Sequence, residues 1–199
     1  RQRQMCIRDS PLMIHLDNGG NNEMYRDWFD HYMERGEDFD YIGLSYYPFW
    51  HGTLQMLEDN MNDMAARYGK ELIVAEVSMG YTMEDYKQYE KLKDSERKGY
   101  ATKPELVAKI EYPMTVQGQA DFTKDFLNRV AHVRDNKGLG FFWWEPAWIP
   151  VHGSGWATPA SLKYMNDPGP CGNEWANQAL FDYDGNVLPA LEVIRDFRK

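Results

Sequence analysis

Carboxylate side chains stand at the ends of short apolar runs in this sequence, where they could carry out chemistry. The clearest case is Glu76, near the end of the run Glu71–Val77, ELIVAEV. That run is short, rich in β-branched residues and bounded by Gly69 and Gly80, so it predicts a buried strand of a parallel sheet. A carboxylate there loses hydration and needs compensation. Taken alone, Glu76 indicates either a functional group or a structural ion pair at the rim of the sheet.

Three more apolar runs end on polar or aromatic side chains, which are Asp17, then Ser45 and Tyr47, then Trp144 with Glu145. The carboxyl ends of parallel strands meet on one rim, which is where such folds place their functional residues. A carboxylate that attacks an anomeric carbon, a second that protonates the leaving oxygen, and aromatic faces for sugar rings make up a glycosidase site. The set therefore predicts sugar hydrolysis more strongly than any one member does.

Four strand and helix units must position these side chains. The sequence predicts strands at 12–17, 39–46, 71–76 and 139–144, and helices at 23–35 with Asn22 as the cap, at 53–68, at 115–136, and from Pro189 onward. Repeated units of this kind give an α/β fold with a parallel sheet. The loop 18–22 does not match the Gly-rich phosphate turn of a doubly wound sheet. The prediction is therefore a partial (β/α)8 TIM barrel containing strands 5 to 8 with their helices.

Composition excludes several functions. The formal charge of -9 argues against a nucleic-acid partner. Two distant cysteines, Cys6 and Cys171, give no disulfide framework, and no apolar run reaches membrane-spanning length. With 7 Trp, 13 Tyr and 9 Phe, the chain has many flat surfaces for a ring-shaped ligand. Residues 1–10 lack apolar periodicity and are interpreted as foreign to the domain, which is expected to cover residues 11–199.

Several longer motifs carry a family resemblance. They are IHLDNG at 14–19, FDYIGLSYYPFWHG at 39–52, VAE at 74–76, TVQGQ at 115–119, GFFWWEPAWIP at 140–150, GSGWA at 153–157 and NQALFD at 177–182. In this order and spacing, residues 12 to about 197 resemble the carboxyl-terminal half of glycoside hydrolase family 53, the endo-β-1,4-galactanases.

The resemblance implies a retaining enzyme acting on β-1,4-galactan, with Glu76 as the nucleophile. It also implies that Tyr47 hydrogen-bonds this nucleophile and that Trp144 floors the subsite where the bond breaks. The acid/base glutamate of such barrels follows strand 4 and has no counterpart in this chain, so we expect the fragment itself to be inactive. Asn173-Glu174 resembles the missing pair, but Glu174 is interpreted as a surface loop residue.

The resemblance further implies substrate contacts for Asp17, His51, Glu145 and Trp148. Each of the first three has an alternative: Asp17 as an anion at a helix start, His51 as a satisfied loop histidine, and Glu145 as a structural pair under Trp144.

No cofactor is expected. Some members of the family hold a structural calcium, but residues 83–89 lack its alternating ligands, so no metal is expected here. The implied partner is a polysaccharide, galactan or arabinogalactan, and the complete protein is expected to be a monomer located extracellularly or in the periplasm, with no signal peptide in this segment. Two alternatives stay open, a non-catalytic carbohydrate-binding barrel and a retaining glycosidase for another β-linked polysaccharide.

Overall fold

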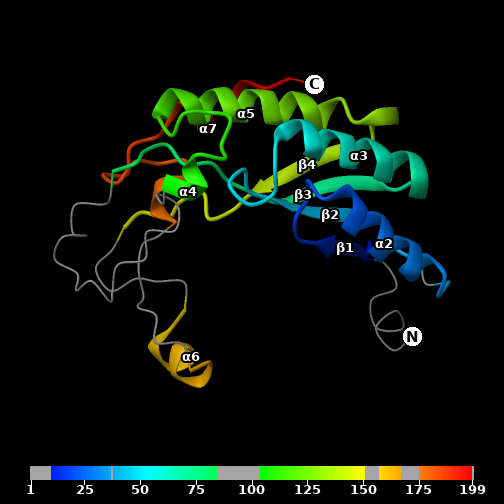
Figure 1. Ribbon diagram of the computed structural model, residues 1–199. Coiled ribbons are helices and arrows are strands. Elements are labelled where there is room, and N and C mark those ends of the chain that lie inside the picture. The colour runs from blue at the N-terminus through cyan, green and yellow to red at the C-terminus, as the bar shows by residue number, and fades with distance from the viewer. Residues whose placement is uncertain (1–9, 37, 85–103, 151–156, 167–174, 199) are drawn as a thin grey trace. The chain divides into compact units, whose positions relative to one another are not determined.

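The structure is a computed structural model that describes residues 10–36, 38–84, 104–150, 157–166 and 175–198 (Figure 1). These residues belong to two compact units. The first contains the chain up to Tyr46, then His51–Val77 and Arg129–Phe142. The second contains Tyr47–Trp50, Ser78–Asn128 and the chain from Trp143 onward. Residues 1–9 of the segment interpreted as foreign lie outside the described residues.

A single sheet forms the centre of the first unit. Its strands lie in the order β1 (Met13–Leu16), β2 (Tyr41–Tyr46), β3 (Glu71–Val77) and β4 (Gly138–Trp143). β1 pairs with β2 in parallel, and β2 pairs with β3 in parallel. Because consecutive strands are neighbours with helices between them, the α/β fold with a parallel sheet is confirmed.

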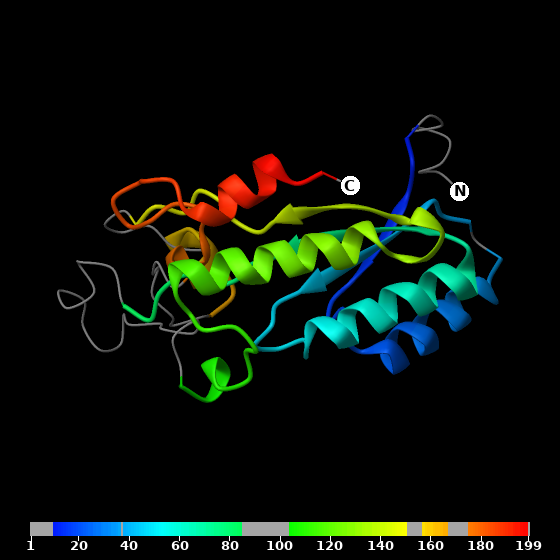
Figure 2. The same cartoon turned by 90° about the horizontal axis from the view of Figure 1, so that it is seen from above.

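Two helices, α2 (Asn22–Met33) and α3 (Leu54–Tyr68), pack against each other in the first unit (Figure 2). Two ion pairs join them, between Arg26 and Asp63 and between Arg67 and Asp30, each at 2.6 Å. Fully buried apolar side chains fill this unit: Phe29, Ile42, Leu44, Leu57, Met61, Leu72 and Val74.

The helix ends follow local capping chemistry. Asn21, rather than the expected Asn22, caps α2, because its side chain accepts the Met24 N–H at 3.1 Å. Thr53 caps α3 in the same way, and Gly69 ends that helix in the left-handed conformation with φ 67°. The single helix expected at 115–136 is α5 (Val116–Ala131) followed by η4 (Arg134–Asn136), because Val133 between them has ψ 136° and leaves the helical conformation.

The second unit contains most of α5 and the shorter elements α4 (Pro104–Val107), α6 (Pro159–Tyr164), η5 (Ala176–Gln178) and α7 (Pro189–Asp196). Its core includes the fully buried rings of Phe122 and Phe126. Gln119 ties two loops together, since its amide donates to the Met79 carbonyl at 2.7 Å and to the Ala179 carbonyl at 2.9 Å. Within the described ranges, no helix has the length and apolarity to cross a membrane.

Candidate active site

The direction of Glu76 depends on a one-residue irregularity in the pairing of β2 with β3. Leu44 pairs with Val74, but Ser45 pairs with Glu76, so Ala75 is an extra residue on β3. Regular alternation would place Glu76 on the same face as the fully buried Val74. The next fully buried residue is instead Val77, three positions on, and half-buried Glu76 shares a face with Ser45. Bulges of this kind re-aim side chains next to active sites.

Asp17 and His51 lie together in the first unit. Asp17 follows β1 and is largely exposed, and its Oδ1 lies 3.3 Å from Nε2 of His51. His51 is only 5% exposed, and its Nδ1 lies 3.0 Å from the carbonyl oxygen of Ser45. Burial lowers the pKa of His51, while Asp17, the Ser45 carbonyl and Glu76 act in the opposite direction. The two residues expected to contact substrate separately therefore form a pair.

Ser45 connects this pair to the neighbouring strands. Its carbonyl accepts from His51 and also from the Gly19 N–H at 2.8 Å. Its hydroxyl lies 2.8 Å from Nε2 of His15 on β1. Ser45 is 3% exposed and is the cross-strand partner of Glu76. The serine thus contacts groups from three consecutive strands or the loops that follow them.

Two glycines allow the loop after β1 to approach β2 closely. A Cβ atom on Gly19 would lie 2.7 Å from the Ser45 carbonyl oxygen, and one on Gly20 would lie 1.9 Å from that of His51. Asn60 of α3 donates to the Gly19 carbonyl at 2.7 Å and secures the loop from the other side. The loop after Asp17 therefore needs glycine at positions 19 and 20, because any other residue would clash with the neighbouring backbone.

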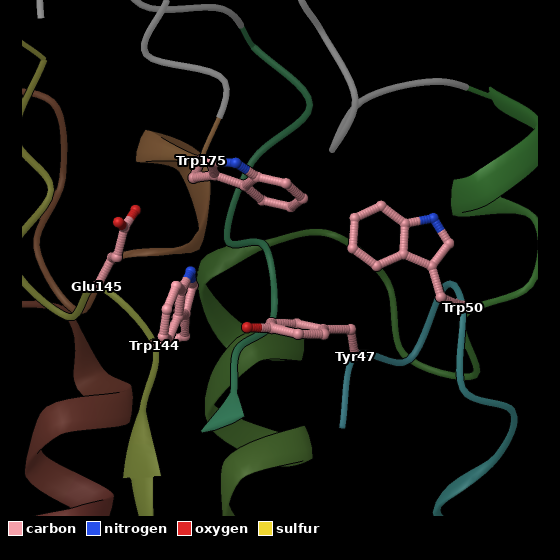
Figure 3. A pocket seen from close by; sticks show the side chains of 5 residues that line it. All are labelled: Tyr47, Trp50, Trp144, Glu145 and Trp175. Carbon is pink, nitrogen blue, oxygen red and sulfur yellow. The ribbon is translucent and has the colours of Figure 1, made fainter. Parts of the chain in front are cut away.

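An aromatic pocket of about 290 Å³ lies in the second unit. Figure 3 shows its five lining side chains, which are Tyr47, Trp50, Trp144, Glu145 and Trp175. The rings of Tyr47 and Trp175 are 6.5 Å apart, with Trp50 in edge-on contact with both. A cavity with aromatic walls and one carboxylate suits a ligand that has both apolar ring faces and hydroxyl groups.

Buried contacts hold this pocket in place. Phe49 is fully buried and stacks on Tyr47 and on Trp175. The indole N–H of Trp143 donates to the Gln178 carbonyl at 2.9 Å and fixes the chain just before Trp144. Glu145 adopts φ 50°, a left-handed conformation that is uncommon outside glycine and that concentrates at functional sites.

The predicted site residues are thus distributed over the two units. The first unit holds Asp17, His51 and Glu76, while Tyr47, Trp144 and Glu145 line the pocket of the second. Trp148, half-buried, is not among the lining residues, although its N–H donates to the Glu145 carbonyl at 3.2 Å.

Sequence reasoning missed Trp50 and Trp175 as pocket residues. A signal existed for Trp50, which lies in the aromatic stretch after Tyr47. Trp175 follows Glu174, which is interpreted from the sequence as a surface loop residue and lies outside the described residues. In the part of the chain that the structure describes, no three His, Cys, Asp or Glu side chains are grouped to hold a metal ion. Residues 85–89 of the stretch considered for calcium are outside that part.

Parallel strands followed by carboxylates, together with an aromatic cavity, are features of carbohydrate-active α/β proteins. The particular family follows from the sequence: a family profile described as glycosyl hydrolase family 53 matches residues 4–194. The chain belongs to glycosyl hydrolase family 53. The match begins inside the segment interpreted as foreign, so the boundary at residue 10 stays a prediction.

Individual relatives agree with this assignment. An endo-β-1,4-galactanase of Bacillus subtilis is 39% identical over 79% of this chain and 38% of its own length. An arabinogalactan endo-β-1,4-galactanase of Humicola insolens is 31% identical over 92% of this chain and 46% of its own. The solved catalytic domain of a family 53 protein from Ignisphaera aggregans superposes with a TM-score of 0.78 at 33% identity, over 93% of this chain and 46% of that one. The chain spans about half the length of the relatives it matches.

Proposed function

We propose that this chain supplies the nucleophile and an aromatic sugar-binding pocket to an endo-β-1,4-galactanase that hydrolyses galactan side chains of pectin or arabinogalactan. The observation that carries the proposal is the bulge on β3, which pairs Glu76 with Ser45 and takes it off the face of the fully buried Val74 in a member of glycosyl hydrolase family 53. The names of two relatives, both endo-β-1,4-galactanases, support the substrate.

In the proposed mechanism, Glu76 attacks the anomeric carbon and forms a galactosyl ester while an acid protonates the leaving oxygen. Water then hydrolyses the ester, with the same second group acting as base, so the configuration is retained. The two carboxyl groups of a retaining site lie about 5 Å apart. We propose that the acid/base glutamate is not among these 199 residues and comes from the part of the domain that the relatives have in addition.

The aromatic pocket is proposed to bind galactose rings. Trp144 forms the floor of the subsite where the bond breaks, and Tyr47 is the proposed hydrogen-bond partner of the nucleophile. Trp50 and Trp175 offer two further faces in the same pocket. Glu145 and Trp148 contact substrate hydroxyl groups in this proposal, and Asp17 with His51 lines the cleft.

For the fold, we propose that β1 to β4 are strands 5 to 8 of a (β/α)8 barrel. Parallel sheets are normally covered on both faces. Leu139 and Phe142 of β4 are nevertheless 48% and 62% exposed, which supports a missing covering layer. The relatives are about twice as long as this chain, so they have the residues for four more strands. The complete protein is proposed to be a monomer without cofactor or calcium, located where its polymer substrate is, outside the cell or in the periplasm.

The decisive experiment combines this chain with the amino-terminal half of a family relative and measures reducing ends released from β-1,4-galactan. We expect negligible turnover from the chain alone and turnover on recombination. Glu76→Gln should then reduce kcat by at least about a thousandfold, as loss of a nucleophile does. The matched control is Glu71→Gln, at the opposite, exposed end of the same strand, which should leave kcat unchanged.

Galactan hydrolysis by the chain alone would disprove the inactive-fragment proposal. Full turnover by the recombined Glu76→Gln variant would show that another residue is the nucleophile. Binding of galactan without turnover, even after recombination, would favour a non-catalytic carbohydrate-binding barrel.

A further inference from the structure

The protonation state of His51 is constrained by its hydrogen bond to Ser45. A carbonyl oxygen can only accept, so the Nδ1 atom, 3.0 Å from the Ser45 carbonyl, must carry a proton and donate it. In the neutral ring Nε2 is then an acceptor. That acceptor faces Oδ1 of Asp17 at 3.3 Å, so two lone pairs oppose each other until Nε2 takes up a proton.

Protonation of His51 changes this contact from a repulsive one to a charge-assisted hydrogen bond. Among the described residues of the first unit, two carboxylates act on the ring, Asp17 after β1 and Glu76 on β3, and both favour its charged form. Tyr25 of α2 stays neutral, because burial and then Asp17 raise its pKa. Burial opposes the charge on His51, so the ring titrates on the acid side of its ordinary value.

We propose that His51 is a positioning residue for Glu76: it fixes the end of β2 through the Ser45 carbonyl and, once protonated at Nε2, presents a positive charge to the Asp17 and Glu76 carboxylates. This inference rests on the proposed function, in which Glu76 is the nucleophile. The structural link is Ser45, which accepts the His51 hydrogen bond and is the cross-strand partner of Glu76.

Coupling between two titrating groups is reciprocal. If the His51 cation attracts the Glu76 carboxylate, that carboxylate must favour the charged form of His51 by the same free energy. The proposal can therefore be tested on His51 itself, without turnover, in the chain as it stands.

The test is an NMR titration of the His51 ring in the full chain, compared among variants. Asp17→Asn removes the facing charge and should lower the His51 midpoint by about 1 pH unit, at the low end for an adjacent opposite charge because Asp17 is 79% exposed. Glu76→Gln should lower it by about 0.5 unit. Glu71→Gln, on the same strand but at its exposed opposite end, should leave it within about 0.1 unit of the wild type.

An unchanged His51 midpoint in Glu76→Gln would overturn the proposal, whatever the midpoint in Asp17→Asn. Neither substitution alters the His51 ring, so the outcome does not depend on whether a His51 variant folds. His51→Asn can keep a donor to the Ser45 carbonyl but carries no charge. In the recombined domain it should move the acid limb of kcat/KM upward by about 0.5 pH unit, whereas a purely structural role would lower activity at all pH values.

The result also separates this inference from the proposed function. Coupled titration together with full turnover by Glu76→Gln would refute the nucleophile assignment and leave the coupling intact. Loss of turnover without coupled titration would refute only the role of His51.

Discussion

Asp63 shows how one carboxylate joins two helices. It accepts two hydrogen bonds from Arg26 and a third from Asn22 at 2.9 Å. The hydrogen bonds from Arg26 are the main reason that the pKa of Asp63 falls to about 2 from its ordinary value of 3.8. A depressed carboxyl pKa stabilises the fold above the unfolded-state value, and this stabilisation is lost as the pH falls through the folded-state value.

We therefore expect Asp63→Asn to lower the free energy of unfolding by about 1 kcal/mol at pH 7, a value discounted for the partial exposure of the pair. The difference from the wild type should shrink between about pH 4 and pH 2, where the wild-type carboxyl also loses its charge. Urea titrations across this range measure it. Asp27→Asn is the control, because Asp27 is 76% exposed and lies 3.6 Å from its histidine partner, and a loss there as large as at Asp63 would contradict the prediction.

At the scale of elements, the loop after β1 decides whether Asp17 and His51 can meet. The loop after β1 reaches the end of β2 only because Gly19 and Gly20 lack side chains. The same approach lets the Ser45 carbonyl accept from both Gly19 and His51. The absence of side chains at Gly19 and Gly20 is therefore required for Asp17 and His51 to form their pair.

Gly20→Ala should cost about 3 kcal/mol of stability, since its Cβ would lie 1.9 Å from the His51 carbonyl oxygen and must displace that backbone. Gly69→Ala is the matched comparison. It has a left-handed φ of 67° and open space around it, so it should cost about 1 kcal/mol from strain alone. Equal losses of unfolding free energy in the two variants would show that close approach is not what requires Gly20.

Several elements could be predicted from the sequence, and the reasons differ by element. The strands of the parallel sheet follow from apolar runs, and the end of α3 follows from Gly69, because these signals are local. The bulge at Ala75 could not be predicted, since regular alternation assigns Glu76 to the opposite face. The Asp17–His51 pair also depends on two distant segments meeting. Trp50 and Trp175 join one pocket across more than a hundred positions of sequence, which no spacing rule reveals.

At the scale of the whole molecule, apolar side chains of β4 remain exposed, with Leu139 at 48% and Phe142 at 62%. In the proposed half barrel, these side chains would be covered by the amino-terminal half of the domain. Exposed apolar groups of this kind favour association and binding of hydrophobic dyes.

The chain alone should therefore bind a dye such as ANS and self-associate at micromolar concentration. Replacing both Leu139 and Phe142 with Ser should reduce dye binding and association while changing stability by about 0.5 kcal/mol or less per site. Val74→Ala, on the fully buried face, should instead cost about 1 to 3 kcal/mol. Sedimentation and ANS fluorescence measure these effects, and a wild-type chain that is monomeric and does not bind dye would contradict the half-barrel proposal.

The extra residue on β3 has a consequence for anyone who transplants this strand into another scaffold. If only the glutamate were copied, two positions after a buried residue on a strand without a bulge, its side chain would point to the buried apolar face. Residues 74 to 77 therefore have to be transferred together, including Ala75, the extra residue of the bulge. Deleting Ala75 alone would place the glutamate directly after Val74 and still opposite Ser45, so the ladder would become regular without turning the glutamate to the other face.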